Sequence, residues 1–170
     1  MSREAFLSAA KESIARMRKA GSEVVIVHHN DADGLSSAAV LQVALSRAGF
    51  AVQRIPLERV HPPIVARIHD RFPSTILYVD LGGRAAPVIS EANRGRRFTI
   101  ILDHHHPERP TDPRVVNLAT EFYGLSGEMD ISAAPQTIAE LRRWNYGVVF
   151  LFTDFPQRLW ALLQNIGQPA

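Results

Sequence analysis

The chain has 170 residues, of which 46% are hydrophobic, and a formal net charge of +2. That length suits one domain, and the hydrophobic fraction is large enough for a substantial core, so a disordered protein is excluded. Cysteine is absent, which excludes a disulfide framework and metal sites made of thiolates. We find neither a signal peptide nor an apolar run near the roughly 18 residues of a membrane span, and we expect a soluble, cytoplasmic protein without a membrane partner.

Arginine carries almost all of the positive charge, because Lys11 and Lys19 are the only lysines. Guanidinium groups suit phosphate recognition. A net charge of +2 is nevertheless far from that of a polycation, and solvation of the surface is the simpler interpretation of this bias.

The predicted elements alternate between helix and strand over the first hundred residues. Residues 2–20 have apolar side chains at helical spacing, and Gly21 can end that helix. In chain order there follow a strand at 24–27, a helix at 35–48, a strand at 51–55, a helix at about 61–68, a strand at 75–79, a helix at about 87–92 and a strand at 98–102. This alternation predicts an α/β fold with a doubly wound, mostly parallel sheet flanked by helices.

After His106 the pattern changes. Three prolines at 107, 110 and 113 indicate a loop, and residues 115–117 are a candidate further strand. Residues 122–127 have the composition of a loop. Helices are predicted at 132–144 and 156–163, separated by an apolar segment at 147–153 that ends beside Asp154.

Polar clusters follow three of the predicted strands at the point where each strand ends. The clusters are His28-His29-Asn30-Asp31-Ala32-Asp33-Gly34, Asp80-Leu81-Gly82-Gly83 and Asp103-His104-His105-His106. The carboxyl ends of parallel strands meet at one edge of a sheet, where open α/β sheets bind ligands. Three clusters of metal-ligand residues in the same structural position are difficult to explain by folding alone.

Each cluster also has a purely structural interpretation. Asp31 or Asp33 alone would be a turn residue or a helix N-cap, and Asp80 before two glycines would be a turn aspartate. Residues 104–106 as an isolated histidine tract would bind metal only weakly. Together, however, the clusters bring many like charges to one sheet edge, which is costly unless cations neutralise them. We therefore favour a metal site.

Carboxylates and imidazoles without thiolates favour a hard or borderline divalent ion, such as manganese, iron, zinc or magnesium. On an extended turn the side chains of Asp31 and Asp33 would diverge and could serve two ions, with Asp80 between them. Two metal ions held in this way, roughly 3.5–4 Å apart, bind the attacking and leaving oxygens of phosphoryl transfer. His105 and His106, with nearby arginines, could hold phosphate oxygens.

Three motifs, in this order, resemble those of the DHH phosphoesterase superfamily: His29-x-Asp31-x-Asp33-Gly34, Asp80-x-Gly82 and Asp103-His104-His105. The first motif is most similar to the archaeal-type RecJ-like branch, as are Asn117, Phe122-Tyr123-Gly124, Gly127 and Ile131-Ser132-Ala133-Ala134. The resemblance covers residues 24–134. It implies a RecJ-like N-terminal catalytic domain.

The resemblance implies roles for the matching residues. His29 and Asp31 would bind the first ion, His104 and Asp33 the second, and Asp80 would bridge the two. The ions would be two divalent cations, with manganese favoured and magnesium as the alternative.

Other site residues follow from the same resemblance. His105 would contact the scissile phosphate, Asp103 would orient the site, and His106 would be a phosphate neighbour, whereas His28 matches no family role. The family has a further metal-binding aspartate in a fourth motif. Asp154 is its candidate here, with a helix N-cap as the equally supported alternative.

Family enzymes normally continue into a separate carboxy-terminal substrate-binding domain, which we expect to be absent from this chain. We expect one catalytic domain over 1–170, with a motif-bearing core at 22–134 and a divergent tail at 135–170. The predicted function is metal-dependent hydrolysis of phosphodiester or phosphomonoester bonds, as in a nuclease that acts on single-stranded nucleic acid or short oligonucleotides. The alternatives are a non-catalytic scaffold or subunit of a nucleic-acid-processing assembly, and a pyrophosphate or polyphosphate hydrolase. A separate chain could supply the missing domain, or the chain could form a homodimer.

Overall fold

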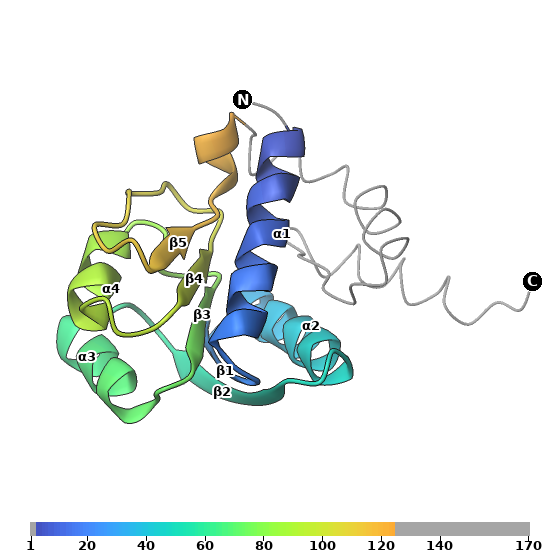
Figure 1. The fold of residues 1–170 in the computed structure, drawn as a ribbon. Helices are drawn as coiled ribbons and strands as arrows, with labels where there is room; N and C mark the ends of the chain where they lie inside the picture. Colours follow the sequence, from blue (N-terminus) through green and yellow to red (C-terminus); the bar gives the residue numbers. More distant parts are fainter. Residues whose placement is uncertain (1–2, 125–170) are drawn as a thin grey trace, which may run out of the picture.

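In a computed structural model that describes residues 3–124, the fold consists of a five-stranded sheet between two layers of helices (Figure 1). In chain order the elements are α1 (Arg3–Ala20), β1 (Glu23–His29), α2 (Ala32–Arg47), β2 (Ala51–Leu57), α3 (Pro62–Arg71), β3 (Thr75–Val79), α4 (Ala86–Asn93), β4 (Thr99–Leu102), β5 (Val115–Asn117) and the 3₁₀ helix η1 (Thr120–Tyr123). The helices predicted at 132–144 and 156–163 and the apolar segment at 147–153 lie outside the described residues.

The strands of the sheet are all parallel and lie in the order β2-β1-β3-β4-β5. In the register of β1, Val27 lies opposite Ile55 of β2 on one side and Tyr78 of β3 on the other. The chain therefore leaves β1 in one direction to form β2 and returns on the opposite side to form β3. This reversal creates a switch point between β1 and β3, and it confirms the predicted doubly wound parallel fold.

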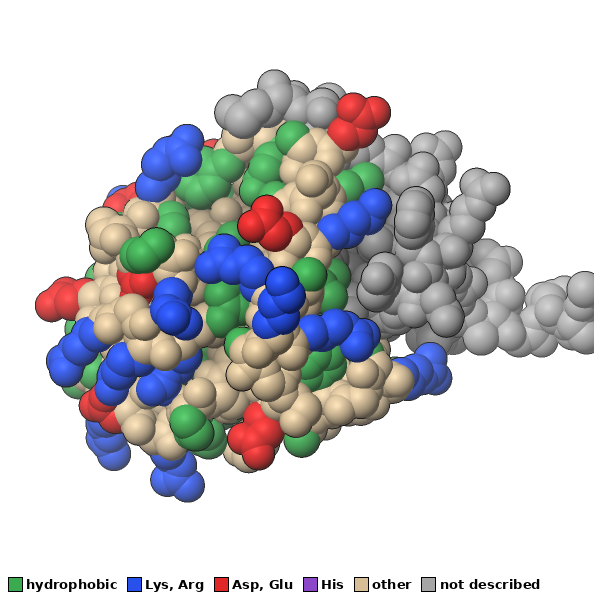
Figure 2. Space-filling view, viewed as in Figure 1, with side chains coloured by type: hydrophobic (Ala, Val, Ile, Leu, Met, Phe, Trp, Pro, Cys, Tyr) green, Lys and Arg blue, Asp and Glu red, His purple; other side chains and the backbone are tan. Residues whose placement is uncertain are grey.

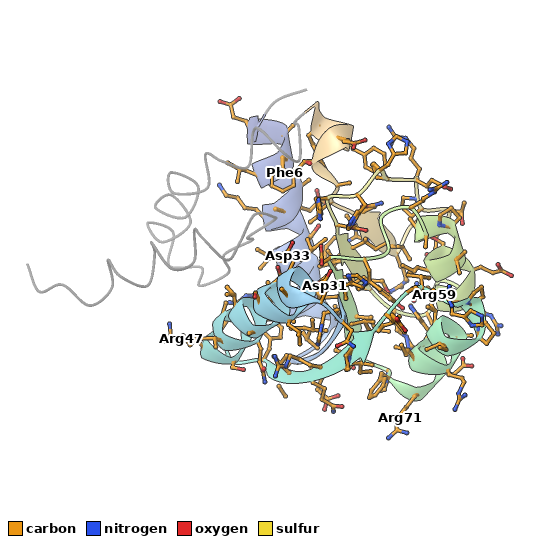
Figure 3. All side chains as sticks on the ribbon, turned by 180° about the vertical axis from the view of Figure 1, so that it is seen from behind. Phe6, Asp31, Asp33, Arg47, Arg59 and Arg71 are labelled. Carbon is orange, nitrogen blue, oxygen red and sulfur yellow. The ribbon has the colours of Figure 1, made fainter. Side chains whose placement is uncertain are left out.

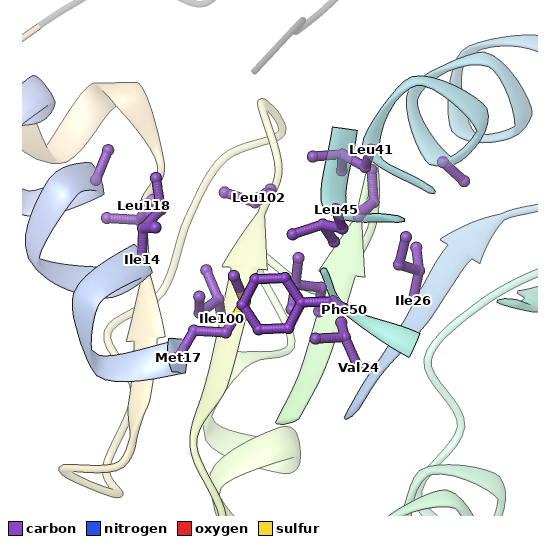
Figure 4. Close-up of a cluster of buried hydrophobic side chains, with 14 of the residues drawn as sticks. Ile14, Met17, Val24, Ile26, Leu41, Leu45, Phe50, Ile100, Leu102 and Leu118 are labelled. Carbon is purple, nitrogen blue, oxygen red and sulfur yellow. The ribbon is translucent and has the colours of Figure 1, made fainter. Parts of the chain in front are cut away.

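The two faces of the sheet are covered by different pairs of helices. One core cluster joins alternate strand residues to α1 and α2, and Figure 4 shows its members Ile14, Met17, Val24, Ile26, Leu41, Leu45, Phe50, Ile100, Leu102 and Leu118. The other joins the intervening strand residues to α3 and α4, and it includes Val25, Val27, Val65, Ile76, Tyr78, Ile89 and Ile101. Because both faces of the central strands are buried, β1 and β3 are continuous apolar runs in the sequence.

Two element boundaries differ from the predicted ones for local reasons. Helix α2 begins at Ala32 instead of Leu35, because Asp31 is its extended N-cap and accepts the N–H of Gly34. Strand β2 continues through Pro56, which an edge strand tolerates, and within residues 3–124 only β1 pairs with β2.

Smaller differences occur near the end of the described chain. Helix α4 ends at Asn93 because Arg94 adopts a left-handed conformation one residue before Gly95, the predicted stop. Phe122, predicted in a loop, lies within η1, while the predicted strand at 115–117 is present as β5.

Charged side chains are dispersed over the face shown in Figure 2, where lysines and arginines are interspersed with acidic residues. This distribution fits the solvating role predicted for most of the arginines. Among the helices of residues 3–124, none combines the length and the apolar character that crossing a bilayer requires.

Candidate metal centre

The predicted clusters meet at the carboxyl edge of the sheet, at the switch point between β1 and β3. Strand β1 ends at His29, whereas Asp80 and Asp103 directly follow β3 and β4. The N–H of Asp80 donates to the carbonyl of Leu102 at 2.9 Å, which continues the pairing of β3 with β4 beyond the strands. Figure 3 shows Asp31 beside Asp33 at the start of α2, away from Arg47 at the end of that helix.

His29, Asp31 and Asp80 form a first group, whose ligand atoms all lie within 4.8 Å of one another. Nδ1 of His29 is 2.7 Å from Oδ2 of Asp31 and 3.8 Å from Oδ2 of Asp80. The other Asp31 oxygen, Oδ1, accepts the N–H of Gly34 at 2.9 Å. Gly34 also lies directly against the backbone of His29, and a Cβ atom there would lie 2.2 Å from the carbonyl oxygen of His29.

Asp80, Asp103, His104 and His105 form a second group, with ligand atoms again within 4.8 Å of one another. Nε2 of His104 lies 3.2 Å from Oδ1 of Asp80, and Nδ1 of His105 lies 2.7 Å from Oδ1 of Asp103. The rings of His104 and His105 are adjacent, with centroids 4.1 Å apart.

Asp80 belongs to both groups and presents one carboxylate oxygen to each. Oδ2 is directed toward His29 and Oδ1 toward His104. Its side chain is 7% exposed, and its backbone has φ of 60°, a left-handed conformation that is uncommon for residues other than glycine. Strain of this kind costs about 1–3 kcal/mol and is concentrated at functional sites.

The buried carboxylate of Asp103 connects two backbone segments of the site. Its Oδ2 accepts the N–H of Gly83 at 2.7 Å, and its Oδ1 accepts the N–H of His105 at 3.2 Å. A Cβ atom on Gly83 would lie 2.9 Å from Oδ2 of Asp103, so this approach also depends on glycine. Asp103 therefore holds the His105 ring and the turn after Asp80 in one arrangement.

Electrostatic effects at the two groups reflect the concentration of carboxylates. Burial acts to lower the pKa of His104, but the hydrogen bond and charge of Asp80, followed by the charges of Asp103 and Asp33, outweigh it and raise that pKa. Burial acts to raise the pKa of Asp31, but the Gly34 N–H and His29 outweigh it and lower that pKa. The site thus favours a negative carboxylate at Asp31 and positive charge at His104, as expected of an edge that attracts cations.

The remaining predicted residues lie outside the two groups of ligand atoms or outside the described residues. Asp33 is partly buried in the first turn of α2, outside both groups, although its charge acts on His104. His106 has an 84% exposed side chain whose Nδ1 is 3.2 Å from Oε2 of Glu121. His28 is buried, with Nδ1 2.8 Å from the carbonyl oxygen of His29. Asp154 lies outside the described residues.

Two residues that hold the site together have no assigned role in the sequence motifs. Gly83 follows Asp80 in its cluster, but no sequence pattern marks its hydrogen bond to Asp103, 20 residues further along the chain. Asn117 is one of the residues that resemble the RecJ-like branch, and its side chain donates to the carbonyl of Gly83 at 3.0 Å.

Residues 23–146 match the sequence model of the DHH family, N-terminal domain. This chain belongs to the DHH family. The match covers all three motifs and both groups of ligand atoms. It confirms the resemblance identified from the motifs.

Solved structures share the fold of this DHH domain. Exonuclease RecJ bound to manganese has a TM-score of 0.56 and 23% identity over 96% of this chain. RecJ of Thermus thermophilus in complex with Mn²⁺ has 0.50 and 22% over 80%, and CDC45 from Entamoeba histolytica has 0.52 and 11% over 98%. These identities establish a common fold alone.

The DHH chain described here spans only part of the length of those proteins. It corresponds to 38% of the manganese-bound RecJ chain, 24% of the Thermus chain and 38% of the CDC45 chain. No curated protein matches the sequence.

Proposed function

We propose that this DHH domain is a two-metal-dependent phosphoesterase that hydrolyses phosphodiester or phosphomonoester bonds, with single-stranded nucleic acid or short oligonucleotides as substrates. The position of Asp80 carries this proposal. One carboxylate that presents separate oxygens to two groups of ligand atoms has the arrangement required to bridge a pair of ions.

The donor set fits a pair of divalent ions. His29 and Asp31 would hold one ion, His104 and Asp33 the other, and Asp80 both. Nitrogen and carboxylate donors without thiolates suit manganese, with magnesium as the alternative; two RecJ structures of the same fold contain manganese. When bound, the ions would neutralise charge on the phosphoryl group and lower the pKa of water.

The chain's own residues would orient the substrate phosphate. Asp103 engages Nδ1 of His105, so Nε2 is the nitrogen that this ring can present to a phosphate oxygen. The His105 side chain is 58% exposed and is therefore accessible to a substrate. His106 is a more peripheral phosphate neighbour, and Asp154 is proposed as a further metal ligand.

We propose that some of the substrate-binding contacts come from outside this domain. A separate chain or a second copy in a homodimer would supply contacts to the nucleic acid. Sedimentation of the chain with and without a single-stranded oligonucleotide tests whether it binds as a monomer or as a dimer.

Hydrolysis assays on the full 170-residue chain test the function. Labelled single-stranded oligonucleotides, dinucleotides, pyrophosphate and polyphosphate are incubated with and without manganese. We expect manganese-dependent cleavage of the nucleic-acid substrates and background rates for Asp80→Asn. Asp70→Asn is the matched control, because Asp70 is an exposed carboxylate that pairs with Arg96 at 2.7 Å and whose loss costs little stability.

The outcomes separate the proposed function from its alternatives. Hydrolysis of pyrophosphate or polyphosphate alone would assign a different substrate class to the same site. If none of these substrates is cleaved, the result indicates the scaffold function and contradicts the proposal, whether or not calorimetry detects manganese binding.

A further inference from the structure

Asn117, the last residue of β5, connects two backbone segments beside the candidate metal centre. Its Nδ2 donates to the carbonyl oxygens of Gly83 and Glu108, each at 3.0 Å. Its Oδ1 accepts the N–H of Ala119 at 3.2 Å. The partners fix the orientation of the amide, because the nitrogen faces two acceptors and the oxygen faces a donor. The residue is 6% exposed, so little water is available to replace these bonds.

Both backbone polar groups of Gly83 are consequently hydrogen-bonded. Its N–H donates to Asp103, while its carbonyl accepts from Asn117 and from the N–H of Glu108 at 2.9 Å. Gly83 lies in the turn between β3 and α4, and Glu108 lies in the loop between β4 and β5. Asn117 is thus a second side chain, beside Asp103, that joins the turn after β3 to the loop after β4.

We propose that Asn117 is a positioning residue of the metal centre, an inference that rests on the proposed function. By holding the turn against the loop, it fixes the separation between the carboxylate of Asp80 and the imidazole of His104. That separation is 3.2 Å between Oδ1 and Nε2. Residues that orient metal ligands without touching the ion affect metal affinity as well as stability.

A role limited to stability has a matched control in the same domain. Asn93 is also buried, and its Nδ2 also has two acceptors, the carbonyl of Arg97 at 3.0 Å and Oδ2 of Asp112 at 2.7 Å. Asn93 lies near Thr99, where β4 begins, whereas the metal centre lies beyond the other end of that strand. Loss of either amide removes comparable bonds, but only Asn117 holds ligand-bearing segments.

The test compares Asn117→Ala, Asn117→Ser and Asn93→Ala in the full chain, with circular dichroism establishing that each is folded. Manganese affinity is measured by titration calorimetry. We expect Asn117→Ala to bind manganese about 10- to 100-fold more weakly than wild type. Asn117→Ser replaces the amide with one hydroxyl donor, and its manganese affinity should lie between those of wild type and Asn117→Ala. Asn93→Ala should keep wild-type affinity. With oligonucleotide as substrate, Asn117→Ala should lower kcat while KM stays unchanged.

Several results would overturn the inference. One is wild-type manganese affinity in a folded Asn117→Ala or, should that variant not fold, in Asn117→Ser. Equal losses of affinity in the Asn117 and Asn93 variants would reduce Asn117 to a stabilising residue. If the wild-type chain binds manganese and cleaves substrate, either of these results in the variants refutes the positioning role alone. A wild-type chain that binds no manganese refutes the proposed function as well.

Discussion

Acidification is predicted to destabilise this domain through His69, a fully buried histidine near the end of α3. Its Nδ1 lies 3.2 Å from Oδ1 of Asn93, and its Nε2 lies 3.1 Å from the hydroxyl of Tyr78. Because the Asn93 oxygen can only accept, Nδ1 carries the proton and Nε2 accepts from Tyr78. The neutral ring therefore satisfies both neighbours. Protonation would place a second donor against the Tyr78 hydroxyl.

The magnitude follows from the pKa of this ring. Burial, and then the positive charge of Arg97, lower the pKa of His69 from 6.5 to about 4. A difference of about 2.5 pKa units at about 1.36 kcal/mol each corresponds to roughly 3 kcal/mol of folding stability. Because the folded-state pKa is depressed, this contribution is fully present above pH 6.5 and is lost as the pH falls to about 4.

Urea unfolding at a series of pH values measures this effect in wild type and in His69→Gln. Carboxylates titrate in the same range in both proteins, so the difference between the two curves isolates the histidine. We expect wild type to lose roughly 3 kcal/mol more than the variant between pH 6.5 and about 4. Parallel stability curves over this range would refute the assignment of a neutral, buried His69.

Three further substitutions test the site itself. Gly34→Ala places a methyl group 2.2 Å from the backbone oxygen of His29, so urea unfolding should show a loss of stability and calorimetry a loss of manganese affinity; unchanged values in both would contradict this packing. Gly83→Ala places a methyl group 2.9 Å from Oδ2 of Asp103. The displaced carboxylate should lower kcat while the melting temperature stays near that of wild type, whereas a lower melting temperature with an unchanged kcat would argue against an orienting role. Asp154→Ala should weaken manganese binding without changing the stability of the metal-free chain, and a change in stability alone would identify Asp154 as a helix cap.

The sheet and the location of the site could be predicted because each depends on local sequence. Strands buried on both faces are apolar runs, and the residues after them must lie at the carboxyl edge of a parallel sheet. The sequence therefore placed Asp80 near His29, and Asp103 near Asp80, at this edge. Pro56 did not interrupt β2, which is an edge strand of the sheet in the part of the chain that the structure describes.

The directions of individual side chains could not be predicted, because they depend on backbone conformation and on distant partners. The left-handed conformation of Asp80, which accompanies the division of its two oxygens between the groups, has no signature beyond the glycines that follow. Asp31 and Asp33 were expected on one extended turn, yet Asp33 already lies within α2. The partners of His69 come from β3 and α4, and no motif connects these residues in the sequence.

The most direct test of a shared Asp80 carboxylate is an anomalous-scattering map from a manganese-soaked crystal of the chain. We expect two manganese peaks, one beside His29 and Asp31 and one beside His104, with an oxygen of Asp80 coordinated to each. A single peak, or two peaks of which only one contacts Asp80, would contradict a bridged two-metal centre in this domain.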